Sequence, residues 1–180
     1  MKCMNVEKTI KSDKLYQGKI INLRIDTVEL PNQKYSKREI IEHCGGVAVI
    51  AVHDGKIILV KQYRKAVEKS LYELPAGKLE AIENPLECAK RELIEETGYE
   101  PQNLKFVLNF YSSPGFSNEM IHLFIADRIS FVGASPDEDE YIEVVEIPFE
   151  DAFRMVSEGE IIDAKTIVGL LYLMKNPQLD

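Results

Sequence analysis

A sharply bounded amphipathic helix between Asn84 and Gly98 is the feature that most limits what this chain can fold into. Asn84 is a favoured N-cap residue, Pro85 suits the first helical position, and a glycine commonly follows the last turn. Ala89 and Leu93 lie four residues apart, so they share one face of the helix. An apolar helical face must be buried, and we expect this one to pack on a sheet.

Two apolar segments that precede this helix have the length of central sheet strands. They cover residues 47–52 and 56–62 and are joined by the turn residues His53-Asp54-Gly55. The remaining predicted elements are three strands, over 104–111, 120–127 and 142–147, and two helices, over 150–157 and 164–175. This order predicts a mixed α/β fold.

The amino-terminal segment differs from the rest because it contains only short strands with polar interruptions. Strands are predicted over residues 8–10, 19–30 and 37–43. Such a small β arm buries little surface by itself, so we expect it to pack on the main body or, as we prefer, on a second subunit. We therefore divide the chain into an arm, 1–43, that forms a homodimer, and a main domain, 44–180.

Charge and cysteine content argue against several classes of partner. The 180 residues carry a formal net charge of -8, which disfavours nucleic acid and anionic membranes but leaves small anionic substrates open if a metal intervenes. Cys3, Cys44 and Cys88 have no metal-like spacing, and we interpret them as reduced thiols of a cytoplasmic protein. The apolar runs are too short to span a bilayer, and residues 1–11 lack a signal-peptide core.

Three glutamates on the predicted helix form a cluster of hard oxygen donors. Glu92, Glu95 and Glu96 are related by three- and four-residue steps, so their carboxylates project into one sector, roughly opposite the apolar face. The alternative is an ordinary solvated helix face. The preceding loop, with Pro75 and Gly77, favours a metal site because an irregular backbone can lend a carbonyl oxygen to the same cation, and Mg²⁺ prefers oxygen ligands.

The segment from Gly77 to Tyr99 resembles the Nudix box. It reads glycine, five residues, Glu83, seven residues, and then Arg-Glu-Leu-Ile-Glu-Glu-Thr-Gly-Tyr over positions 91–99. Every fixed position of the box is matched, and on this ground the chain is identified as a member of the Nudix hydrolase family. Tyr99 stands where an aliphatic residue is usual, and because that position is a packing site we expect little effect on activity.

This resemblance implies the Nudix α/β/α sandwich with a mixed sheet, and hydrolysis of a nucleoside diphosphate linked to another group. It also implies two or three Mg²⁺ ions, with Mn²⁺ as an expected substitute. Glu92 and Glu96 would be the principal metal ligands, and Glu95 a further ligand or a catalytic group that positions water. The carbonyl oxygen of Ala76 would be an additional ligand. The ions would offset the charge of the pyrophosphate and lower the pKa of bound water.

Two further residues of the box are predicted to orient these ligands. Arg91 lies four residues before Glu95 and can pair with it, while Glu83 can hold Arg91 from the loop. We therefore assign Arg91 to the catalytic site, with plain surface ion pairs as the alternative interpretation.

Three segments outside the box resemble the ADP-ribose pyrophosphatase branch of the family. They are Gln62-Tyr63-Arg64, Glu73-Leu74-Pro75-Ala76-Gly77 and the stretch 112–119. Pro114 lies fifteen residues beyond Tyr99, about where that branch carries a proline. This resemblance continues over 137–145 and 163–166, and it implies cleavage of ADP-ribose to AMP and ribose 5-phosphate.

The branch also implies a general base from the loop that follows the strand near Asp127. The acids available there are Glu138, Asp139, Glu140 and Glu143, and a run of solvated loop acids is the alternative interpretation. We choose Glu140, because its place two residues before Ile142 resembles the branch best.

Four residues are expected to bind the substrate. Arg64 would grip a phosphate through charge-assisted hydrogen bonds, and Arg38 would reach phosphate or ribose. Tyr16 would flank the adenine, and Glu119 would hydrogen-bond the ribose. Because residues of the arm often act across a dimer in this branch, the partner subunit is part of this prediction.

Two competing interpretations remain at this level. The enzyme could act on another nucleoside diphosphate derivative, such as a sugar nucleotide or a dinucleoside polyphosphate. A non-hydrolytic nucleotide-binding module is the second, although the box carboxylates are complete and no DNA-binding extension is present.

Overall fold

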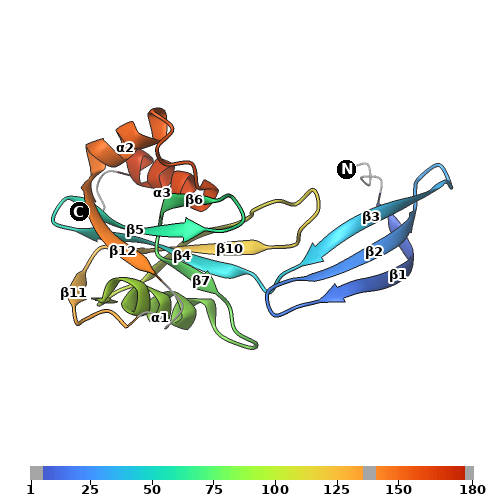
Figure 1. Cartoon of the computed structure of the whole chain (residues 1–180), viewed down its shortest axis with the longest axis horizontal. Coiled ribbons are helices and arrows are strands. Elements are labelled where there is room, and N and C mark those ends of the chain that lie inside the picture. Colours follow the sequence, from blue (N-terminus) through green and yellow to red (C-terminus); the bar gives the residue numbers. More distant parts are fainter. Residues whose placement is uncertain (1–5, 136–140, 177–180) are drawn as a thin grey trace. The chain divides into compact units, whose positions relative to one another are not determined.

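The computed structural model describes residues 6–135 and 141–176, which divide into two compact units. The first unit contains the residues up to Gly45 together with 111–120, and the second contains the rest of the described chain. Each unit has a sheet of its own (Figure 1). Within the described part of the chain, no helix combines the length and the apolar character needed to cross a membrane.

The first unit is built on a three-stranded antiparallel sheet. Its strands, in spatial order, are β1 (Lys8–Gln17), β2 (Asn22–Glu29) and β3 (Tyr35–Glu42). Every residue of β1 is exposed. The stretch 112–119 is joined to β3, because the Ile41 N–H donates to the Phe116 oxygen (2.8 Å) and the Asn118 N–H donates to the Ile41 oxygen (3.2 Å).

The strand predicted over residues 8–10 is longer in the structure. It continues to Gln17 because antiparallel pairing with β2 extends from Lys8 opposite Glu29 to Gln17 opposite Asn22. The sequence gives a weak signal here, since the polar run 12–14 has low intrinsic preference for a strand. Backbone pairing with a neighbouring strand therefore decided the length of β1.

The second unit contains a seven-stranded mixed sheet. Its main path, in spatial order, is β12 (Ile142–Pro148), β5 (Lys56–Arg64), β4 (Gly46–His53), β10 (Met120–Ala126) and β9 (Lys105–Tyr111). Two short strands lie off this path, β6 (Lys69–Glu73) beside β5 and β7 (Ala76–Lys78) beside β4. β10 runs parallel to β4, whereas β5 and β7 are antiparallel to it. A separate ladder joins β8 (Tyr99–Pro101) to β11 (Ile129–Phe131).

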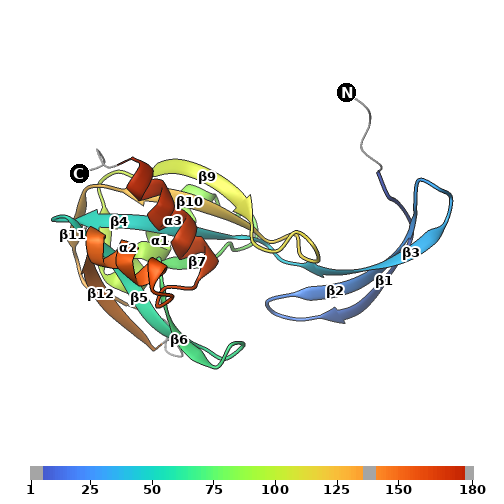
Figure 2. The ribbon, with the colours of Figure 1, turned by 90° about the horizontal axis from the view of Figure 1, so that it is seen from above.

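Helices cover both faces of this sheet (Figures 1 and 2). α1 (Pro85–Thr97) lies on one side, and α2 (Phe149–Ser157) and α3 (Ala164–Lys175) lie on the other. Strand β4 shows why both faces need cover: Val47, Val49 and Ala51 belong to the core under α1, while alternate residues such as Ile50 belong to the core under α2 and α3. The predicted α/β/α sandwich with a mixed sheet is confirmed.

The predicted boundaries of α1 are also confirmed, and they hold the site residues in register. The Asn84 side chain accepts a hydrogen bond from the Leu86 N–H (2.8 Å), and Gly98 has φ 74°, a left-handed conformation that favours glycine. Tyr99 then packs edge-on against Phe131, with ring centroids 5.5 Å apart.

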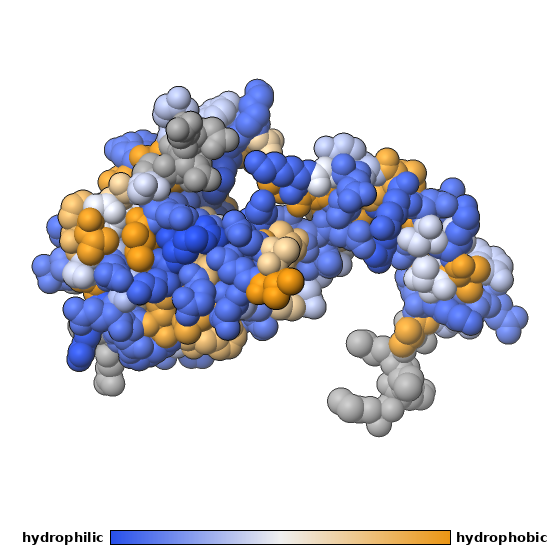
Figure 3. Space-filling view, turned by 90° about the horizontal axis from the view of Figure 1, so that it is seen from below, coloured by the Kyte–Doolittle hydropathy of each residue, from blue (hydrophilic) through white to orange (hydrophobic). Residues whose placement is uncertain are grey.

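On the face seen in Figure 3, the surface of the second unit is mainly hydrophilic, with apolar side chains in small separate patches.

Candidate active site

The three glutamates of α1 differ widely in exposure. The side chain of Glu95 is 39% exposed, that of Glu92 is 14% exposed, and Glu96 is only 4% exposed. A solvated acidic helix face, the alternative considered above, does not describe Glu92 and Glu96. Two carboxylates of α1 are turned toward protein instead of water.

Glu92 and Glu96 converge on the backbone of Ala76 and Gly77. The Ala76 N–H donates a hydrogen bond to Glu96 Oε2 (2.9 Å). The Glu92 carboxylate lies directly against Gly77, because a Cβ added there would be 1.8 Å from Glu92 Cδ. Glycine is therefore required at this position for the Glu92 carboxylate to approach the backbone so closely.

Arg91 joins three carboxylates through a single guanidinium group. Its Nε and Nη2 atoms donate to the two oxygens of Glu83 (3.0 and 3.2 Å), and its Nη1 atom contacts Glu95 Oε2 and Glu92 Oε1, each at 2.9 Å. These hydrogen bonds from Arg91 lower the pKa of Glu83 to about 2. Glu83 and Glu95 in turn raise the pKa of Arg91, so the guanidinium stays charged. The geometry suits the orienting roles predicted for Arg91 and Glu83.

The donor set of this site fits a hard divalent cation. Within residues 6–135 and 141–176, no group of three or more His, Cys, Asp or Glu side chains is arranged to hold a metal ion. Mg²⁺ usually takes one or two carboxylates and keeps several waters, so the pair Glu92 and Glu96 beside the Ala76 backbone meets its needs. Glu95 is held by Arg91 in this arrangement, and its role as a further ligand stays a prediction.

Arg64, predicted to bind a phosphate, is turned toward Glu73. Its Nε and Nη2 atoms donate to Glu73 Oε1 (2.7 Å) and Oε2 (2.8 Å). Among residues 6–135 and 141–176, Nη1 has no such partner and could meet a phosphate. Glu73 is 2% exposed. Burial by itself would raise the pKa of Glu73, but the hydrogen bonds from Arg64 and the charge of Lys165 lower it below its ordinary value.

The other predicted substrate residues lie in the first unit. Arg38 forms a two-pronged pair with Glu7, from Nε to Oε2 (2.9 Å) and from Nη2 to Oε1 (2.5 Å), and its hydrogen bonds lower the pKa of Glu7. Tyr16 is 57% exposed, and its ring covers Gly18, where an added Cβ would meet ring atom Cε1 at 2.5 Å. Tyr16 therefore presents an open aromatic surface.

Glu119 lines an open pocket of about 280 Å³ within the first unit. Ser112 Oγ donates to Glu119 Oε2 (2.5 Å), and His43 Nδ1 lies 3.6 Å from Glu119 Oε1. The apolar part of the pocket wall is formed by Ile20, Ile21, Ile41 and Phe116. One polar edge and one apolar wall suit a ligand with both a hydroxylated and a flat apolar part.

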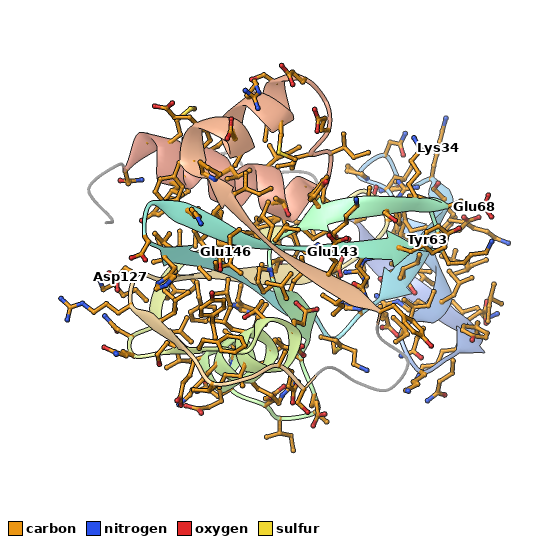
Figure 4. The ribbon with its side chains drawn as sticks, turned by 60° about the vertical axis from the view of Figure 1, so that its left-hand side comes forward. Lys34, Tyr63, Glu68, Asp127, Glu143 and Glu146 are labelled. Carbon is orange, nitrogen blue, oxygen red and sulfur yellow. The ribbon has the colours of Figure 1, made fainter. Side chains whose placement is uncertain are left out.

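The candidate base Glu140 lies outside the described residues, as do Glu138 and Asp139. Glu143, the fourth acid considered, is exposed on β12, where it pairs in register with Lys61 of β5 (Figure 4). The choice of Glu140 stays a prediction.

Sequence reasoning did not assign Glu73, Lys165 and Thr166 to the site. Lys165 Nζ contacts Glu73 Oε2, and Thr166 Oγ1 accepts a hydrogen bond from the Leu74 N–H (2.8 Å). The sequence distinguishes the segment 163–166 only through its resemblance to the ADP-ribose pyrophosphatase branch. Its contact with Glu73 joins residues 92 positions apart, which no local pattern reveals.

A family model described as the NUDIX domain matches residues 42–168. The chain belongs to the Nudix family. A second model, described as the nucleoside diphosphate sugar hydrolase N-terminal domain, matches residues 7–41 of this Nudix protein. The family resemblance carried by the box is thereby confirmed.

Individual relatives cover almost the whole chain. The protein is 50% identical over 170 residues to "ADP-ribose pyrophosphatase" of Bacillus subtilis (strain 168), and 46% identical over 170 residues to "Methanol dehydrogenase activator" of Bacillus methanolicus. Each alignment covers 93% of this chain and 92% of the relative. A solved structure, "Crystal structure of ADP compounds hydrolase", superposes with a TM-score of 0.86 at 18% identity, covering 97% of this chain and 96% of that one, and so shares the fold.

Proposed function

We propose that this Nudix protein is a divalent-metal-dependent hydrolase that cleaves the pyrophosphate of ADP-ribose to AMP and ribose 5-phosphate. The convergence of the Glu92 and Glu96 carboxylates on the Ala76–Gly77 backbone carries the proposal, because it places hard oxygen donors together. The 50% identity to a protein named ADP-ribose pyrophosphatase supports the choice of substrate.

The metal site would consist of Glu92, Glu96 and the carbonyl oxygen of Ala76, with Glu95 at its edge. We propose two or three Mg²⁺ ions, replaceable by Mn²⁺. When bound, such ions supply charge neutralisation for the pyrophosphate and a lowered pKa for coordinated water. Arg91, locked by Glu83, keeps the Glu92 and Glu95 carboxylates from swinging away. Glu140 is our candidate for the base that accepts the proton of the attacking water.

Substrate binding is proposed for residues of both units. Arg64 Nη1 is available to a phosphate oxygen, and Glu73 fixes the plane of the guanidinium that carries it. Tyr16 offers an exposed ring for stacking on adenine, and Glu119 offers carboxylate oxygens to ribose hydroxyls. Glu7 already pairs with Arg38, so an anionic substrate would have to displace Glu7 or share the guanidinium with it. Arg38 would therefore contribute positive charge to binding more than a fixed geometry.

We further propose that the arm, 1–43, mediates a homodimer of a cytoplasmic protein and that the main domain is 44–180. The supporting observation is β1, an edge strand whose ten residues are all exposed in a sheet of three strands. Unpaired strand edges and small sheets gain stability by covering one another. Light scattering tests this directly: a monomer that hydrolyses ADP-ribose at full rate contradicts the cross-subunit role of the arm.

The function is tested by chromatographic product analysis after incubation with ADP-ribose and Mg²⁺. The comparison includes a chelator control, the Glu96→Gln variant and a matched Glu100→Gln variant. Within the described part of the chain, the Glu100 carboxylate forms a surface pair with Lys90, at 3.0 Å, so replacing it should leave activity unchanged. AMP and ribose 5-phosphate should appear with the wild type and Glu100→Gln in Mg²⁺, and be absent with Glu96→Gln or chelator.

Other outcomes separate the competing functions. Cleavage of a sugar nucleotide or a dinucleoside polyphosphate, but not of ADP-ribose, keeps the hydrolytic chemistry and discards the substrate. Binding of nucleotides with no turnover of any of them in Mg²⁺ or Mn²⁺ favours the binding module and contradicts the proposal.

A further inference from the structure

Residues 73–77, here called the strap, connect β6 to β7 and carry the backbone that Glu92 and Glu96 approach. Contacts from several elements hold successive residues of the strap. The Leu74 N–H donates to Thr166 of α3 (2.8 Å), and the Pro75 oxygen accepts from the Val49 N–H of β4 (2.9 Å). The Leu74 side chain is completely buried. Hydrogen bonds from α3 and β4, together with the burial of Leu74, therefore help to fix the path of the strap.

The first turn of α3 supplies a polar cluster that reaches the strap. Asp163 caps the helix, and its Oδ2 atom accepts hydrogen bonds from the Thr166 N–H (3.0 Å) and Thr166 Oγ1 (2.6 Å). The Thr166 hydroxyl thereby donates to the cap while accepting from Leu74, so its orientation is fixed in both directions. Thr166 is completely buried, which makes its hydroxyl the protein partner that satisfies the Leu74 N–H.

Lys165 provides a second connection, through charge. Its ammonium contacts Glu73 Oε2 and lies 3.1 Å from Asp163 Oδ2, and its side chain is 14% exposed. With Arg64 on the other side of Glu73, the group contains two cations and two carboxylates. Removing Lys165 would leave the nearly buried Glu73 with Arg64 as its remaining cationic partner, and would leave Glu73 Oε2 with one contact fewer. Lys165 therefore links Glu73, the first residue of the strap, to the first turn of α3.

Van der Waals contact between α3 and the strap is also close. A Cβ added at Gly169 would lie 2.6 Å from Leu74 Cδ1 and 3.1 Å from Ile50 Cγ1. The absence of a side chain at Gly169 thus lets α3 rest directly on Leu74. α3 holds the strap by a hydrogen bond, an ion pair and direct packing at once.

We propose that Lys165 and Thr166 are positioning residues for the metal site, acting through the strap to hold the Ala76–Gly77 backbone where Glu92 and Glu96 meet it. The inference rests on the proposed function, because it assigns a purpose to that same metal site. Each residue acts through the strap, Lys165 through its contact with Glu73 and Thr166 through its hydrogen bond with Leu74. Groups that hydrogen-bond directly to metal ligands typically affect metal binding about 10–100-fold, and because Lys165 and Thr166 act one step further out, we expect an effect at the lower end of this range.

The test measures Mn²⁺ binding by calorimetric titration and, separately, the Mg²⁺ concentration that gives half-maximal hydrolysis of ADP-ribose. Thr166→Val removes the hydroxyl while keeping the volume of the side chain, and Thr166→Ser restores the hydroxyl. Lys165→Met removes the cation and keeps the aliphatic chain. Leu173→Ala is the matched control, because it opens a cavity in the core under the same helix, about two turns beyond Thr166, and removes neither a hydrogen bond nor a charge from the strap.

Thr166→Val and Lys165→Met should each bind Mn²⁺ about tenfold more weakly and need correspondingly more Mg²⁺. Thr166→Ser and Leu173→Ala should bind Mn²⁺ like the wild type, even where Leu173→Ala lowers the melting temperature further. If Lys165→Met does not fold, the comparison of Thr166→Val with Thr166→Ser decides the test. The inference is overturned if Thr166→Val binds Mn²⁺ as tightly as the wild type does. It is also overturned if the wild type binds no Mn²⁺.

These outcomes stay distinct from those that test the function. A wild type that binds Mn²⁺ but hydrolyses none of the nucleotides discards the proposed function, and the Mn²⁺ titrations of the variants still decide the positioning role. If Leu173→Ala weakens Mn²⁺ binding as much as Thr166→Val does, the weakening results from lost stability, and the inference is overturned as well.

Discussion

Replacing Gly77 by alanine tests whether the Glu92 carboxylate acts from the place it occupies beside the strap. A Cβ at this position would lie 1.8 Å from Glu92 Cδ and 1.9 Å from Oε1. Ordinary van der Waals contact begins near 3.4 Å, so the carboxylate has to retreat by about 1.6 Å. The methyl group would then occupy the space between Glu92 and the backbone, where the proposed metal ligands converge.

The expected effect is large on catalysis and small on stability. A misplacement of about 1 Å in a catalytic group can cost about 100-fold in rate, roughly 2.7 kcal/mol of transition-state stabilisation. Gly77 does not have positive φ, and the atoms that the methyl meets belong to the flexible end of a side chain. The fold therefore accommodates alanine, and we expect the melting temperature to change by less than about 3 °C.

The assay is steady-state hydrolysis of ADP-ribose in saturating Mg²⁺, together with thermal unfolding of the same samples. Gly55→Ala is the matched control, because Gly55 has φ 72° in the turn between β4 and β5 and nothing lies within 4 Å of its added Cβ. That variant should lose roughly 1–2 kcal/mol of stability through backbone strain while keeping its turnover per folded molecule. Gly77→Ala should thus lose activity and keep its stability, whereas Gly55→Ala should lose stability and keep its activity.

The reasoning is refuted if Gly77→Ala retains kcat/KM within threefold of the wild type while remaining folded. That result would mean that Glu92 works equally well from a displaced position. A parallel loss of activity and stability in Gly77→Ala would instead show that the strap, and not the carboxylate, was disturbed.

Three further predictions use other parts of the chain. Iodoacetamide at pH 8.5 should modify exposed Cys44 and spare Cys88, whose pKa burial raises to about 12, as peptide mass spectrometry would show. Tyr99→Phe should lower the free energy of unfolding by about 1 kcal/mol at pH 7. Because the hydrogen bond to Glu146 raises the pKa of Tyr99 from 10.0 to about 12, denaturant titrations should show this difference intact below pH 10 and vanishing as the pH rises through 12. Glu140→Gln should reduce kcat much more than substrate affinity, and an unchanged rate would remove Glu140 from the mechanism.

Local chemistry in the sequence was enough to predict α1 and its boundaries. The capping side chain of Asn84 and the left-handed backbone of Gly98 depend on residues within one helical turn, so a sequence pattern can identify them. Strands β4 and β5 were equally clear, because they are buried apolar runs. Strands β6 and β7 were missed, since they are short and gain their hydrogen bonds only by pairing with β5 and β4.

The residues of the candidate site could also be predicted from the sequence, but the differences in burial among them could not. Spacing places Glu92, Glu95 and Glu96 in one sector of the helix. It does not say that Glu96 is buried against the strap while the Glu95 side chain stays 39% exposed. That distinction depends on where the strap crosses the helix, which other elements of the sandwich decide.

The sequence by itself determined the mixed α/β order and the clustering of carboxylates on α1, because these depend on residue identity and short-range periodicity. Its resemblance to the Nudix box added the family and, with it, the sandwich fold. Only the tertiary structure revealed that Arg64 is engaged by Glu73 and that Lys165 and Thr166 hold the strap. The contacts of Lys165 and Thr166 join residues 92 positions apart, and the Arg64–Glu73 pair depends on the pairing of β5 with β6. The strength of all three comes from burial, which no single segment encodes.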